Sequence, residues 1–145
     1  MAYATQADLL KALPELELIR LTDDDGAGSI DTDKVAEALD SAADEINVWI
    51  GGRVKLPLTA TVPVLLNLNR DLAVYNLYSR VSTEVPETWR ERRKDALKLL
   101  EKINDGKVSL GAQPPPAPPA STGYDGGIQT QVRTQIFSET ELDKF

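Results

Sequence analysis

Apolar residues recur every three or four positions through most of this chain, a spacing that places them on one face of a helix. The pattern predicts three long helices, at about 32–50, 61–81 and 85–105. The first has the most continuous apolar stripe and is the best candidate for a central helix. In chain order, the predicted inward residues are Val35, Leu39, Ala42, Ala43, Ile46, Trp49 and Ile50; Leu65, Leu68, Leu72, Tyr75 and Tyr78; and Trp89, Ala96, Leu97, Leu100 and Ile103.

Two shorter helices are predicted ahead of these three. Thr5 and Asp8 have the spacing of a capping box, which marks the start of the first helix. Pro14 suits the first position of the second, because its missing N–H is not needed there. The first helix is expected to bury Leu9, Leu10 and Leu13, and the second Leu16 and Ile19, with Leu18 and Leu21 as further candidates.

Glycines mark the ends of two of the long helices. Gly51 and Gly52 are expected to end the 32–50 helix through a left-handed cap, followed by an extended connector at 53–58 that packs on the core. Gly106 is expected to end the last helix. A short strand is predicted at 107–111.

Proline divides the chain into unequal parts. Five of the six residues at 114–119 are proline, which favours an extended polyproline spacer of roughly 20 to 25 Å at about 3.1 Å per residue. The predicted parts are a helical body at 1–112, a linker at 113–120 and an arm at 121–145. The fold class is therefore mostly α, a small bundle of about five helices with a proline-rich linker and a C-terminal β-strand arm.

Within the arm, apolar and polar residues alternate from Ile128 to Phe137, which predicts one strand. A single strand leaves its backbone hydrogen-bonding groups unpaired, so we expect it to pair with a neighbouring subunit or another partner. The alternative is a tail without a fixed partner. The residues expected to carry the arm's contacts are Ile128, Val132, Ile136, Phe137 and Phe145.

The composition of the 145 residues narrows the possible chemistry. Cysteine and histidine are both absent, which excludes disulfides, thiolate nucleophiles, zinc sites of the Cys/His type and imidazole bases. No residue is nominated as catalytic, and no enzyme activity or cofactor is expected. No stretch is apolar enough for a membrane span and no signal peptide is recognisable, so a cytosolic protein is expected.

Charge is unevenly distributed along the chain, whose net charge is −7. Residues 1–50 carry 12 acidic and 3 basic side chains, a net −9, whereas residues 51–112 carry 11 basic and 7 acidic ones, a net +4. Opposite charges of this kind suit a head-to-tail ring of copies. The alternative is that the two halves pack on each other within one chain. The acidic total argues against avid nonspecific DNA binding.

The loop from Asp23 to Asp31 partly follows the pattern of a calcium loop. Asp23, Asp25 and Asp31 occupy ligand positions, and a calcium-responsive regulatory module is the alternative function that they suggest. However, Ala27 and Lys34 stand where side-chain oxygen ligands are needed. The other interpretation is a glycine-containing turn whose aspartates cap the next helix.

The only dense basic run is 90–94. It is interleaved with Glu87, Glu91 and Asp95, so a solvated face with ion pairs inside the helix is one interpretation. The other is contact with an acidic protein surface or with passing DNA phosphates. The candidate contact residues of the body are Arg53, Lys55, Arg92 and Arg93. Trp49 and Trp89 are expected to be core anchors rather than ligand platforms.

Several segments together resemble a known family. They are residues 3–9, 21–31, 52–58 and 106–111, with 135–138 and 142–145 at the end of the chain. This order of motifs is similar to that of the Mu-like phage family of small virion-morphogenesis proteins. The resemblance implies a helical head-to-tail adaptor, or connector, that assembles as a ring beneath the portal of a tailed phage. Its implied partners are further copies of itself, the portal protein and tail-side proteins, with DNA only as passing cargo. The implied location is the virion, after assembly in the host cytoplasm. The family brings no catalytic residues.

Overall fold

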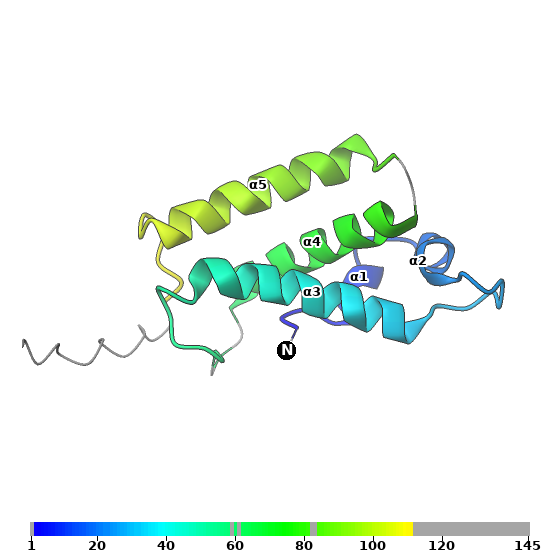
Figure 1. Ribbon diagram of the computed structural model, residues 1–145, viewed down its shortest axis with the longest axis horizontal. Helices are drawn as coiled ribbons and strands as arrows, with labels where there is room; N and C mark the ends of the chain where they lie inside the picture. Colours follow the sequence, from blue (N-terminus) through cyan, green and yellow to red (C-terminus); the bar gives the residue numbers. More distant parts are fainter. Residues whose placement is uncertain (1, 59, 61, 82–83, 112–145) are drawn as a thin grey trace, which may run out of the picture.

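The computed structural model describes residues 2–58, 60, 62–81 and 84–111, which form five helices. Three long helices run lengthwise, and two short ones lie near one end of them (Figure 1). All five were predicted. The linker at 113–120 and the strand at 128–137 lie outside the described residues. The helices are α1 (Gln6–Leu10), α2 (Glu15–Thr22), α3 (Thr32–Ile50), α4 (Pro63–Val81) and α5 (Glu87–Asn104).

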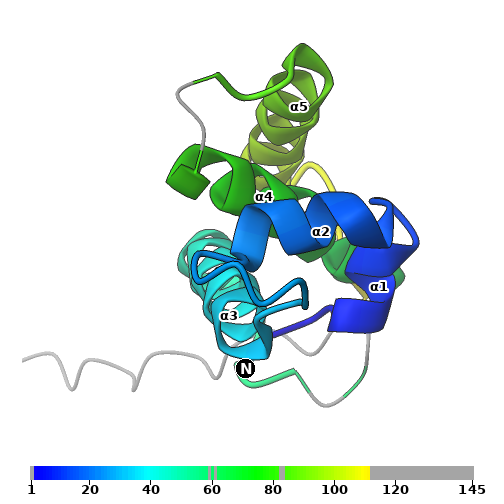
Figure 2. The ribbon, with the colours of Figure 1, turned by 90° about the vertical axis from the view of Figure 1, so that its right-hand side faces the viewer.

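The helix at the centre is α4. It packs against each of the other four helices, and Figure 2 shows α5 on one side of it and α3 on the other. The prediction that α3 is central was wrong. α3 has a clear apolar stripe because one side of it packs on the core and the other side faces solvent. The middle of α4 is covered on nearly all sides, so its apolar residues do not form one stripe. The buried residues of α4 are Leu65, Leu68, Asn69, Leu72, Ala73, Val74, Leu77 and Tyr78.

A buried asparagine joins three segments at this centre. Asn69 of α4 is fully buried. Its Oδ1 accepts a hydrogen bond from the backbone N–H of Ala4 at 2.9 Å, and its Nδ2 donates to the backbone carbonyl of Leu39 in α3, also at 2.9 Å. Buried polar groups need such partners because they have lost their contacts with water. Asn69 therefore fixes the N-terminal segment and α3 relative to α4.

The inward face of α2 differs from the prediction. Leu18 and Leu21 are fully buried, whereas Leu16 is 80% exposed and Ile19 is only half-buried. In a helix of eight residues, both pairs have the three-residue spacing of a buried face, and the contact of α2 with α4 decides between them. In α1, Leu10 is 40% exposed, although Leu9 and the following Leu13 are buried as predicted.

The end of α3 differs from the prediction. Gly51 has a right-handed φ of −60°, and the positive-φ glycines among the described residues do not include Gly52, so the predicted left-handed cap was wrong. The connector turns back instead, since the N–H groups of Arg53 and Val54 both reach the carbonyl of Ile50. Val54 is buried against the core, as predicted.

The end of α5 agrees with the sequence. Gly106 has a φ of +76°, and the N–H of Lys107 reaches back to the carbonyl of Lys102 at 2.9 Å. This is the bonding pattern of a glycine-terminated helix. The short strand predicted at 107–111 is not present, because these residues have no strand beside them in the part of the chain that the structure describes.

The tryptophans differ in burial. Trp89 is buried at the start of α5 and stacks on Tyr78 of α4, with 6.5 Å between ring centroids. Trp49 is only partly buried. The prediction of a core anchor is therefore confirmed for Trp89. The hydroxyl of Tyr78 also donates to Glu17 of α2 at 2.9 Å, which links three helices at this end of the bundle.

Replacing Asn69 with leucine tests the importance of the buried hydrogen bonds. Asn69→Leu keeps the branched shape of the side chain but leaves the N–H of Ala4 without its partner, so we expect a loss of about 1–3 kcal/mol in the free energy of unfolding. Urea denaturation measures it. The control is Asn67→Leu, the same change at an exposed position of α4. Equal stability of the two variants would contradict the assignment.

Candidate functional site: the aspartate loop and the charged helix faces

The loop between α2 and α3 is shaped by its own aspartates. The carboxylate of Asp23 accepts hydrogen bonds from the backbone N–H groups of Ala27 and Gly28, at 2.9 and 2.7 Å. Asp31 caps α3 by accepting from the N–H groups of Asp33 and Lys34, at 3.0 and 3.2 Å. The turn-and-cap interpretation of these aspartates is confirmed.

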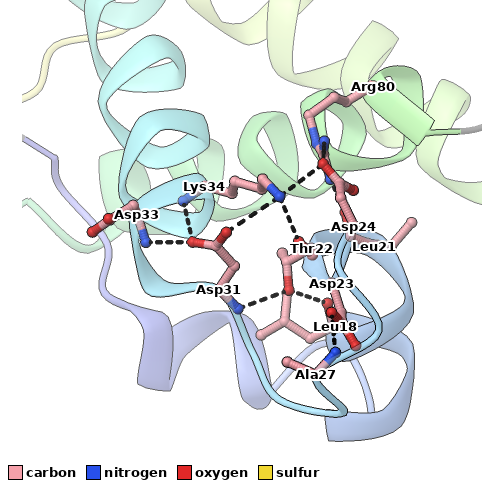
Figure 3. Close-up of polar contacts among 10 residues, drawn as sticks. All are labelled: Leu18, Leu21, Thr22, Asp23, Asp24, Ala27, Asp31, Asp33, Lys34 and Arg80. Carbon is pink, nitrogen blue, oxygen red and sulfur yellow. Dashed lines mark hydrogen bonds and ion pairs between the residues drawn. The ribbon is translucent and has the colours of Figure 1, made fainter.

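A lysine lies between the loop's carboxylates (Figure 3). The Nζ of Lys34 is 2.7 Å from Asp24 and 3.2 Å from Asp31, and it also donates to the backbone carbonyl of Thr22 at 3.1 Å. On its other side, Asp24 pairs with Arg80 of α4 at 2.7 Å. Arg80 donates to the carbonyl of Leu21 as well, so the loop is attached to both α3 and α4.

These contacts stabilise the charged forms of the loop's side chains. Hydrogen bonds from Arg80 and then Lys34 lower the pKa of Asp24 well below its ordinary value. The N–H groups of Gly28 and Ala27 lower the pKa of Asp23. In return, the hydrogen bond to Asp24 raises the pKa of Lys34. Each carboxylate in this network is therefore ionised throughout the neutral range.

The arrangement does not favour a calcium ion. The carboxylates of Asp23 and Asp31 are already used by backbone N–H groups, and the ammonium group of Lys34 stands between Asp24 and Asp31. In residues 2–58, 60, 62–81 and 84–111, no three acidic, histidine or cysteine side chains are grouped so that they could share a metal ion. The side chain of Asp25 is exposed.

Two of the predicted contact residues have partners inside the molecule. Arg93 donates two hydrogen bonds to Glu45 of α3, at 2.8 and 3.1 Å, and lies over the ring of Tyr75. Arg92 lies over the ring of Trp89, 4.7 Å from its centroid, with Asp71 at 3.7 Å. The ion pairs with Glu45 and Asp71 cross between helices, whereas the interleaved acids had suggested pairs along α5. Whether either arginine also binds a partner stays a prediction.

Arg53 lies at the other end of α5 from Arg92 and Arg93. The Nε of Arg53 donates to the backbone carbonyl of Asn104 at 2.5 Å, where it satisfies a carbonyl at the end of the helix. Lys55 is exposed. The four basic residues therefore form two separate groups. A shallow groove of about 290 Å³ lies beside Arg53, and its lining residues are Arg53, Val54, Ile103, Gly106, Val108, Ser109 and Leu110. The arm residues Ile128, Val132, Ile136, Phe137 and Phe145 lie outside the described residues.

Sequence reasoning missed an acidic row on the outer face of α3. We define the acidic row as Asp33, Glu37, Asp40 and Asp44, all of which are exposed. Their spacing of three or four residues keeps the row on one side of the helix. The outer face of α5 carries both signs, because exposed Glu87, Glu91 and Glu101 alternate there with Arg90, Lys94, Lys98 and Lys102. The same helical spacing that indicates the apolar stripes would have indicated the acidic row.

Comparisons with known proteins agree with the resemblance that the sequence motifs indicated. The model of the family described as Bacteriophage Mu, Gp36 matches residues 3–126. The chain is also similar to the Mu-like prophage FluMu protein gp36 of Haemophilus influenzae, with 35% identity over 111 residues, or 75% of each chain. The family match includes all five helices and extends past them into the C-terminal part of the chain.

Acid should reduce the contribution of Asp24 to stability. The pKa of Asp24 is lowered from 3.8 in the folded state, so its ion pairs stabilise the protein fully above that pH, and the stabilisation decreases progressively as the pH falls from 3.8 through the lower pKa of the folded state. We expect Asp24→Asn to be less stable than the wild type at neutral pH, and this difference to shrink by about pH 3. Urea denaturation at the two pH values measures it, with exposed Asp25→Asn as the control. A difference independent of pH would contradict the role of Asp24.

Proposed function

The chain belongs to the family described as Bacteriophage Mu, Gp36, and on that premise we propose that it is a structural adaptor which joins the head of a tailed phage to its tail. It is a bacteriophage protein with a helical fold. In the proposed role, the protein acts by binding its neighbours and catalyses no reaction. It assembles in the host cytoplasm and remains in the virion.

The observation that carries this proposal is that the helical body is complete without the C-terminal part of the chain. The buried apolar core extends from Ala4 to Ile103. Among the described residues, no buried side-chain nitrogen or oxygen lacks a hydrogen-bond partner. The described core lies within Ala4 to Ile103, and we propose that residues 121–145 contact another protein.

We propose that the copies form a ring between the portal protein and tail-side proteins. Each body occupies one place in the ring, and the alternating segment 128–137 adds a strand to a neighbouring protein. Strand addition supplies the backbone hydrogen bonds that a lone strand lacks. Since contacts within a ring act together, each one can be individually weak.

DNA and membranes have no specific contact in this proposal. The negative net charge of −7 makes the chain a poor general ligand for DNA phosphates, so DNA is passing cargo. Of the helices that the structure describes, none is both long and apolar enough to cross a membrane.

Deleting residues 121–145 tests the arm. We expect the shortened chain to remain folded, because the core lies within Ala4 to Ile103, but heads to remain unjoined to tails when it is the only copy. Circular dichroism checks folding, and electron microscopy of the particles counts joined heads.

Two full-length variants separate the arm's pattern from its length. Replacing Ile128, Val132 and Ile136 with asparagine removes the apolar face of the predicted strand and should act like the deletion. The same replacement of Gln129, Gln131 and Gln135 changes only the other face and should leave joining intact. Normal joining in the deletion variant would rule out the arm's role.

A further inference from the structure

The shallow groove of about 290 Å³ lies at the end of the bundle where α3 and α5 both end (Figure 1). Two of its lining residues, Val54 and Ile103, are buried members of the core. Val108 and Leu110 line it as well, and the described chain ends directly after them, at Gly111. Apolar surface is therefore open at the point from which the C-terminal part of the chain departs.

The backbone of residues 108–110 is largely unpaired. The N–H of Val108 reaches back to the carbonyl of Lys102 at 3.3 Å. Among the described residues, the N–H groups of Ser109 and Leu110 donate no hydrogen bond, and the carbonyls of residues 108–110 accept none. Free donors and acceptors of this kind are what an extended chain needs in order to add a strand.

The side chains of this segment alternate in character. Val108 is 37% exposed and Leu110 is partly buried against the core, with the exposed Ser109 between them. This alternation predicted a strand at 107–111, and the element that it lacks is a second strand beside it. Two paired strands are stable only when one of their faces packs against other elements. In the groove, that face would contact the core.

We propose that segment 128–137 of a neighbouring copy docks in this groove and pairs with residues 108–110. The inference rests on the proposed function, since it names the surface that receives the arm. In this arrangement, the side of the arm with Ile128, Val132 and Ile136 faces the apolar residues of the groove. Each copy gives one arm and receives one, so the contact repeats head to tail until a ring closes. Only a few residues pair at each groove, and the closed ring makes these weak contacts act together.

The proline-rich spacer favours a neighbouring copy over the arm's own. Residues 114–119 begin four positions after Leu110 and, when extended, carry the chain about 18 Å, from roughly 3.1 Å per residue. Residues 120–127 cover at most about 28 Å, so most of their length would be needed to bring Ile128 back to the same groove. Paired strands of one chain are ordinarily joined by about two to five residues. An arm received by a neighbouring copy needs no such return.

Disulfide formation between copies tests the pairing, because the chain has no cysteine of its own. One full-length variant carries Ser109→Cys. The other, which is made longer by an affinity tag, carries cysteine at each position from 129 to 135 in turn. The two are mixed and oxidised, and electrophoresis without reductant measures the mixed dimer. A disulfide requires Cα atoms within about 7 Å of each other, so it reports residues that lie opposite each other.

We expect the odd-numbered positions of the arm to react. Opposite residues of paired strands project to the same face, and in a strand Ser109 projects to the face away from Val108 and Leu110. The matching arm positions are 129, 131, 133 and 135, which alternate with the apolar side. At least one of them should give roughly tenfold more mixed dimer than any of positions 130, 132 and 134.

Two further comparisons control for chance collisions and for the role of the groove. Ser41→Cys, at an exposed position of α3, replaces Ser109→Cys and should give little mixed dimer with any arm position. Val108→Asn, added to the Ser109→Cys chain, should lower the yield roughly tenfold, because docking would remove its amide group from water without a partner. Val48→Asn makes the same change at a valine of α3 that is 83% exposed, and should have no effect.

A single chain with Ser109→Cys and the most reactive arm cysteine should form disulfide-linked multimers. The inference is overturned if this chain instead closes on itself as a faster-migrating monomer, or if odd and even positions react equally. It is also overturned if no arm position exceeds the Ser41→Cys control, or if Val108→Asn and Val48→Asn act alike.

The comparison of odd and even positions does not depend on Val108→Asn, and it decides the inference even if circular dichroism shows that this variant fails to fold. None of these results decides the proposed function, which is measured by the joining of heads to tails. If the groove does not receive the arm and joining still requires it, the arm binds another protein.

Discussion

The enclosure of α4 is the constraint on which the rest of the structure depends. From Leu68 to Tyr78 no residue of α4 is exposed, so the fully buried Asn69 must find its hydrogen-bond partners within the protein. Its two hydrogen bonds lead to different segments, the N-terminal one at Ala4 and the α3 backbone at Leu39. Satisfying one side chain therefore sets two further segments in place. An apolar core alone would define this geometry less strictly, because packing has no direction whereas a hydrogen bond does.

Once α3 and α5 are placed by α4, the charged residues divide into those that face the body and those that face away. On the inner side, acidic residues of the first half meet basic residues of the second, as in Glu45 with Arg93 and Asp24 with Arg80. The interpretation that the two halves pack on each other within one chain is borne out by these pairs. On the outer side, α3 carries the acidic row, whereas α5 carries both signs. The opposite net charges of the two halves therefore provide ion pairs within each copy and also leave charged residues on its surface.

The long helices could be predicted from the sequence because their stripes contain many apolar residues, and a wrong assignment would expose most of them. The face of α2 could not, since eight residues offer two equivalent pairs and only the contact with α4 distinguishes Leu18 from Leu16. At the aspartate loop, the sequence predicted that aspartates cap the next helix and that Lys34 does not suit a calcium site. It did not predict that the ammonium group of Lys34 lies between Asp24 and Asp31, because that position depends on how the loop folds. Arg93 and Glu45 are 48 positions apart, and no local pattern relates them.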